Sequence, residues 1–198
     1  MSLNKALHGT EISSLASRML ADTGVHWLGV FARDQLQPLG RSQQRLFALV
    51  VNTDPADKPG AHWLAFFASE DGPTAAPLEM FDLYGLPPDM HSLDHLAPRI
   101  YSSSASYQSL DSSVCGHYCL FFFFNHAHGL SYFTIKRMLR SHMLGSFSIT
   151  VSTDVYVSRF IDSLQALYRI VLPCTRLTHS QTCTKKCFAC YFCCTLND

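Results

Sequence analysis

The chain has 198 residues, of which 47% are hydrophobic and 15% are charged, and its 15 basic and 15 acidic residues cancel to a formal net charge of zero. This size and composition fit one domain with a sizeable core and a short appendage. The charge balance gives no overall signature of a nucleic-acid-binding protein. The longest strongly apolar run, Tyr118 to Phe124, has 7 residues. A membrane-spanning helix needs about 20, so we expect no membrane span.

The first part of the chain predicts one helix followed by several strands. Apolar side chains at helical spacing in residues 11–21 predict an amphipathic helix, with Thr10 as its N-cap. Residues 53–60 contain two prolines and a glycine and predict a loop. The apolar runs on either side of this loop predict the two strands of a hairpin. In chain order, the predicted strands are 27–31, 45–52, 62–68 and 78–84.

The second part of the chain predicts a buried helix over residues 115–128, ended by Gly129. The other elements predicted here are a short helix at 92–98, a short strand within 99–107, and helices at 134–144 and 155–170, the last with Asp154 as its cap. The pattern indicates an α+β fold, in which a small mixed sheet packs on a central helix that begins at Cys115. Residues 1–172 are expected to form this domain.

Cys115 is the candidate nucleophile of the chain. It opens the predicted buried helix, where the unpaired N–H groups of the first turn favour a thiolate, which is the reactive form of the side chain. Gly116 beside it would let the backbone of a substrate approach closely. Cys119, one turn further along, is expected to belong to the core.

Two histidines could serve as the base for this thiol. His62 lies in the segment Gly60-Ala61-His62-Trp63-Leu64, and His26 lies in a similar segment, Gly24-Val25-His26-Trp27-Leu28. His62 is favoured because it follows a strand and a turn, and because a strand that bears an acid lies 20 residues further on. His26 has no acidic strand directly after it.

Asp82 is the candidate acid that orients the imidazole of His62 and stabilises its protonated form. Strand pairing would bring the two residues to one face of the sheet. Glu79 lies on the opposite face of the same predicted strand and is therefore the weaker candidate.

Gln108 is the candidate oxyanion donor. Its side-chain amide would act together with the backbone N–H of Cys115 on the developing negative charge of the reaction. Trp63, next to the histidine, is expected to cover His62 and shield the site.

These segments together resemble the adenovirus-type cysteine proteases (adenain) and, more distantly, the proteases that remove SUMO-like modifiers. The segment Gly60–Phe66 resembles the histidine strand of the family, and Phe81–Gly85 resembles its acid segment. Six residues separate Gln108 from the Cys115-Gly116 pair, which is the spacing of the adenovirus type. The resemblance covers residues 8–172.

The resemblance implies a papain-like cysteine endopeptidase that uses Cys115, His62, Asp82 and Gln108 and cleaves near small residues, especially glycine. It also implies a viral or virus-like-transposon maturation protease, with viral precursor proteins as substrates and an activating peptide as a partner.

The adenovirus enzymes are activated by a viral peptide joined through a disulfide and by DNA. No cysteine lies between Asp82 and Gln108, and the net charge is zero, which speaks against both routes here. No cofactor is expected.

Two other functions remain open at this point. The first is a deconjugating isopeptidase for a ubiquitin-like protein, because both kinds of protease accept small residues before the scissile bond. The second is a non-catalytic binding module whose C-terminal tail holds zinc.

The C-terminal segment 173–198 has a different composition and is rich in cysteine. Its thiols and the upstream His179 are soft ligands suited to zinc, but they are crowded more closely than the two separated ligand pairs of a zinc site. We therefore assign no metal ligand, and a disordered or palmitoylated tail is the alternative. The cysteines concerned are Cys174, Cys183, Cys187, Cys190, Cys193 and Cys194.

The N-terminal residues 1–17 contain no apolar stretch typical of a secretory signal. We therefore expect an intracellular location, in the cytoplasm, the nucleus or a virion, where the thiols would stay reduced.

Overall fold

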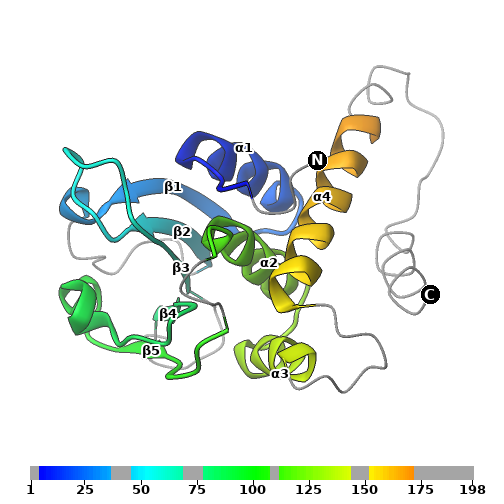
Figure 1. Ribbon diagram of the computed structural model, residues 1–198. Helices are drawn as coiled ribbons and strands as arrows, with labels where there is room; N and C mark the ends of the chain where they lie inside the picture. Colours follow the sequence, from blue (N-terminus) through cyan, green and yellow to red (C-terminus); the bar gives the residue numbers. More distant parts are fainter. Residues whose placement is uncertain (1–4, 37–45, 69–77, 108–111, 144–151, 172–198) are drawn as a thin grey trace. The chain divides into compact units, whose positions relative to one another are not determined.

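The computed structural model describes residues 5–36, 46–68, 78–107, 112–143 and 152–171 of the chain (Figure 1). Residues Met1–Ala166 form one compact unit, and the fold and the site described below belong to it. The second unit, Leu167–Asp198, is described only over residues 167–171, the end of the helix that begins at Thr153. Within the described ranges, no helix has the length and apolarity that crossing a membrane requires.

A five-stranded mixed sheet organises the first unit. The strands lie side by side in chain order, as Figure 1 shows. The two outer pairs are parallel and the two inner pairs are antiparallel. The α+β class and the hairpin of the second and third strands are therefore confirmed. The strands are β1 (His26–Ala32), β2 (Phe47–Asn52), β3 (Trp63–Ala68), β4 (Leu78–Phe81) and β5 (Ile100–Ser102).

Four α-helices occur in the described residues, and α2 occupies the central position. It packs against β3 and also contacts α1 and α3. Three short 3-10 helices connect the strands. The helices are α1 (Gly9–Leu20), α2 (Cys115–Ala127), α3 (Tyr132–Met143), α4 (Thr153–Val171), η1 (Arg33–Gln35), η2 (Pro88–His91) and η3 (Asp94–Leu96).

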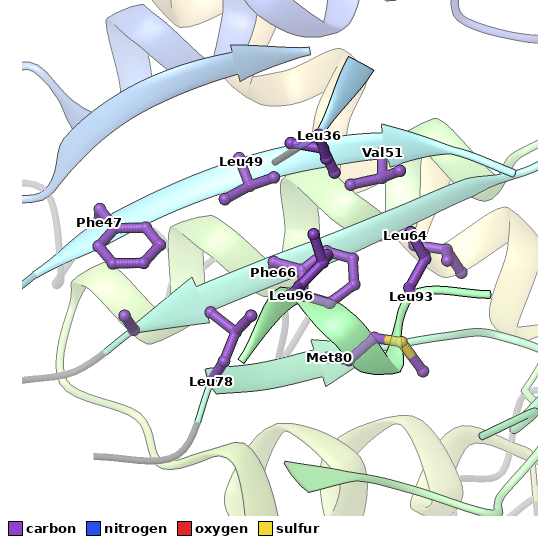
Figure 2. Close-up of a cluster of buried hydrophobic side chains, with 11 residues drawn as sticks. Leu36, Phe47, Leu49, Val51, Leu64, Phe66, Leu78, Met80, Leu93 and Leu96 are labelled. Carbon is purple, nitrogen blue, oxygen red and sulfur yellow. The ribbon is translucent and has the colours of Figure 1, made fainter. Parts of the chain in front are cut away.

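Apolar side chains cover both faces of the sheet, because alternate residues of a strand point to opposite sides. On one face, Leu93 and Leu96 from the segment of η2 and η3 cover a cluster contributed by β2, β3 and β4 (Figure 2). On the other face, the ring of Phe122 in α2 stacks on Phe81 at 4.9 Å and meets the edge of Phe67 at 6.4 Å. The inner strands β2, β3 and β4 are therefore buried on both sides, which explains their nearly continuous apolar sequences.

Two predicted helix caps are wrong. Thr10 lies inside α1, which is preceded by His8, and the backbone N–H of His8 donates to the carboxylate of Glu11 at 2.9 Å. Asp154 lies in the first turn of α4 and accepts a hydrogen bond from the Tyr118 hydroxyl at 2.8 Å. Its carboxylate satisfies a buried polar group of α2 instead of its own helix end.

Candidate active site

His62 and Asp82 meet at one edge of the sheet because of the strand order. His62 immediately precedes β3 and Asp82 immediately follows β4, and these two strands are antiparallel, with Ala65 opposite Phe81. The Nε2 atom of His62 lies 2.7 Å from Oδ1 of Asp82. The predicted strand 78–84 is too long, since β4 ends at Phe81 and Asp82 already stands outside the ladder. The two side chains therefore meet beyond the strand ends.

The carboxylate of Asp82 accepts four hydrogen bonds from residues that the structure describes. Oδ1 accepts from His62 and from the backbone N–H of Tyr84 at 3.0 Å. Oδ2 accepts from the backbone N–H of Leu86 at 2.9 Å and from Nε2 of His91 at 3.1 Å. Burial opposes the ionised form, but the hydrogen bonds from the two histidines and from Tyr84 outweigh it and hold the pKa of Asp82 far below its usual range. The acid is therefore a permanent anion at neutral pH.

The imidazole of His62 joins Asp82 to the thiol of Cys115. Burial disfavours the charged ring, but hydrogen bonds to Asp82 and to Cys115, together with their negative charges, raise the pKa of His62 to about 9. Since Nε2 faces Asp82, the other ring nitrogen, Nδ1, is left for the thiol. Cys115 is the first residue of α2, and its thiol is free and half-buried. At neutral pH the ring therefore carries both of its N–H protons, one facing the acid and the other facing the sulfur.

The chain matches no protein-family model, and no significant match to it is found among curated proteins. The chemistry of the site is therefore argued from its own residues.

A tight loop delivers His62 to this position. The backbone N–H of Thr53 donates to the carbonyl of His62 at 2.9 Å, and Oδ1 of Asn52 accepts from the N–H of Ala61 at 3.3 Å. Gly60 has a φ of +95°, and a Cβ atom there would lie only 2.4 Å from Nδ2 of Asn52. The loop therefore requires glycine both for its backbone conformation and for its contact with the asparagine.

Glycine at position 116 allows a close contact with the N-terminal part of the chain. A Cβ atom on it would lie 2.9 Å from Cδ1 of Ile12 and 3.2 Å from Cβ of Leu7. The space on the Cβ side of Gly116 is thus filled by α1 and by the segment before it. Cys119 is 1% exposed, as expected for a core residue, and its thiol donates to the carbonyl of Trp63 at 3.5 Å.

The aromatic ring against His62 belongs to Tyr84. The two ring centroids are 4.5 Å apart and their planes are inclined by 35°. The indole of Trp63, expected to cover the histidine, instead donates to the carbonyl of Leu7 at 3.2 Å. Tyr84 was treated only as the end of a strand. Its position two residues after the acid, in a turn closed onto that acid, is the signal that could have identified it.

The remaining candidates stand apart from this cluster or cannot be placed. His26 is exposed at the start of β1. Glu79 forms a hydrogen bond with His126 near the end of α2. Gln108 and the cysteine-rich segment 173–198 lie outside the described residues. Sequence reasoning missed His91. In the sequence, its only relation to the site is a separation of nine residues from Asp82.

The arrangement around Cys115 is suited to moving one proton. A buried carboxylate orients an imidazole, the imidazole meets a thiol, and the thiol stands at the start of a helix, where no side chain caps the N-terminus. In the part of the chain that the structure describes, no group of three or more His, Cys, Asp or Glu side chains is arranged to hold a metal ion.

Proposed function

We propose that this protein is a papain-like cysteine endopeptidase that cleaves peptide bonds near small residues, above all glycine. Cys115 is the nucleophile, His62 is the general base and acid, and Asp82 orients the ring. The observation that carries the proposal is the imidazole of His62, which engages both the Cys115 thiol and the Asp82 carboxylate. A nucleophile, a base and an orienting acid in this sequence of contacts are what thiol-dependent acyl transfer requires.

The reaction proceeds in two steps. The Cys115 sulfur, having given its proton to His62, attacks the scissile carbonyl carbon, and a carbon–sulfur bond forms while the carbonyl oxygen becomes an oxyanion. The intermediate collapses, the carbon–nitrogen bond breaks, and the His62 imidazolium donates its proton to the leaving amine. Water then attacks the thioester and gives a proton to His62. The acid product leaves, and the thiolate is restored.

Two donors are proposed for the oxyanion. One is the backbone N–H of Cys115, which belongs to the first turn of α2. The other is the amide of Gln108, which is assigned from its spacing before Cys115 in the adenovirus-type pattern. A single donor of this kind is worth about 10²–10³ in rate.

The resemblance to the adenovirus-type proteases suggests the biological setting. On this basis the domain 1–172 would mature viral or virus-like-transposon precursor proteins inside a cell or virion. A peptide activator would be a further partner.

The decisive experiment measures the selectivity of thiol modification and the cleavage of peptides in the same preparation. The full chain is treated with limiting iodoacetamide at pH 7, and each cysteine is quantified by peptide mapping. Cleavage is followed on a peptide library with glycine around the scissile bond. Cys115→Ala and His62→Ala are the test variants, and Cys119→Ala is the matched control, one helical turn from the nucleophile.

We expect Cys115 to be modified first in the wild type and more slowly in His62→Ala. Cleavage should disappear in Cys115→Ala and persist in Cys119→Ala, with the circular dichroism spectrum unchanged in both. Equal modification of all exposed thiols, or full cleavage by Cys115→Ala, would overturn the proposal. If cleavage is confined to fusions of a ubiquitin-like modifier, the protein is a deconjugating isopeptidase and not an endopeptidase.

A further inference from the structure

The acid of the site is held by a second imidazole in addition to that of His62. Nε2 of His91 lies 3.1 Å from Oδ2 of Asp82, and the two imidazole rings are 6.5 Å apart. A carboxylate can only accept, so Nε2 of His91 carries the proton and donates it. We propose that His91 is a positioning residue, which fixes the Asp82 carboxylate in the orientation that His62 needs. This inference rests on the proposed function.

His91 is anchored independently of the other donors to this carboxylate. The donors Tyr84 and Leu86 are backbone N–H groups of the chain directly after Asp82, so they move with the acid and its own turn. His91 ends η2, and Leu93, which follows it, is fully buried in the core cluster beneath the sheet. The bond from His91 therefore ties the acid to the core of the domain.

The hydrogen bond between His91 and Asp82 is buried, so its loss should disturb the site. The side chain of His91 is 9% exposed, and that of Asp82 is completely buried. Without His91, one lone pair of a buried carboxylate would lose its partner and the group would turn toward another donor. Turning Oδ2 also turns Oδ1, to which the catalytic imidazole is bound. A small rotation at Asp82 thus displaces the ring that serves Cys115.

The test compares two substitutions of similar size. In His91→Gln the side-chain amide can put a donor close to the position of Nε2, whereas His91→Leu fills the space without a donor. Two readouts are measured on the full chain: kcat and KM for a cleaved glycine-containing peptide, and the NMR signal of the His62 Nε2 proton. The signal is assigned by its absence in His62→Gln.

We expect His91→Leu to lower kcat by about 10- to 100-fold with little change in KM, because the catalytic ring is displaced while substrate contacts stay. Its His62 proton signal should shift upfield or broaden through exchange with water. His91→Gln should restore both kcat and the signal to near wild-type values.

Three outcomes would overturn the inference. They are a wild-type kcat and His62 signal in His91→Leu, equal losses in both variants at equal thermal stability, or a loss confined to KM. Should His91→Leu not fold, His91→Asn replaces it, since its shorter amide does not reach Oδ2. A wild-type protein that cleaves nothing would count against the proposed function alone, because the proton signal still decides whether His91 positions Asp82.

Discussion

Nε2 of His62 and Oδ1 of Asp82 lie 2.7 Å apart although 20 residues separate them in the sequence. Each stands one residue outside a strand, at the same edge of an antiparallel pair. The side chain of a residue outside the ladder can turn away from the sheet. The hairpin therefore sets how close the two residues come, and the flanking turns set how they face each other.

Replacing Asp82 by Asn should remove most of the activity. The amide keeps the size of the side chain, but it leaves the imidazolium without a negative partner and can hold the wrong tautomer of the ring. We expect kcat to fall by about 10²- to 10⁴-fold. Glu79→Gln is the matched control, because Glu79 contacts His126 and not His62. Comparable losses in both variants would contradict the role given to Asp82.

The rate of cleavage should fall on the alkaline side as His62 loses its proton. The pKa of the ring is raised to about 9, so the imidazolium that protonates the leaving amine is present below that pH and disappears as the pH rises through it. A profile of kcat/KM between pH 6 and 10 measures this limb. A plateau that continues unchanged to pH 10 would show that no group with this pKa takes part.

The pKa of His62 should depend on Cys115. The hydrogen bond to the thiol and the negative charge of the sulfur both help to raise the pKa of the ring. In Cys115→Ser the hydroxyl stays neutral, so the charge is lost and the pKa of His62 should fall below about 9. NMR titration of the ring protons measures the change without any substrate. An unchanged midpoint would mean that sulfur and imidazole are not coupled.

Placing a methyl group on Gly60 should damage the loop that carries His62. Alanine at its φ of +95° is strained, and the added Cβ would lie 2.4 Å from the Asn52 amide. We expect Gly60→Ala to lower the free energy of unfolding by about 2–4 kcal/mol and kcat by roughly tenfold.

Gly24→Ala provides the control for this effect. Gly24 has a similar φ of +80°, but no atom lies within 4 Å of the position of a Cβ there. Its substitution should cost only about 1 kcal/mol, measured by urea denaturation, and leave cleavage unchanged. Equal losses of stability at the two glycines would show that the contact with Asn52 has no energetic weight.

The sequence predicted the order of the elements well, because strands buried on both faces and a long apolar helix leave strong local signals. It also led to His62 and Asp82, since a turn and a strand end can be read from neighbouring residues. Tyr84 and His91 were missed for a physical reason. Their contacts depend on how the turn after β4 folds back onto its own acid, and no periodic pattern records such a turn.

The contacts of Gly116 and Trp63 were not foreseen for a related reason. From the chemistry alone, Gly116 was expected to lie next to a substrate and Trp63 was expected to cover His62. Their actual contacts are with Leu7 and with the start of α1. The Trp63–Leu7 pair is 56 residues apart in the sequence, and contacts over such separations cannot be read from either segment alone.

The packing of Ile12 and Leu7 against Gly116 places the segment before α1, and α1 itself, next to the residue that follows Cys115. Removing or replacing the segment before α1 would open a gap one residue from the thiol. Variants shortened at this end for expression or display should therefore be judged by the reactivity of Cys115 as well as by yield. An antibody or peptide that displaces α1 from the domain should therefore change the reactivity of Cys115 without contacting the thiol.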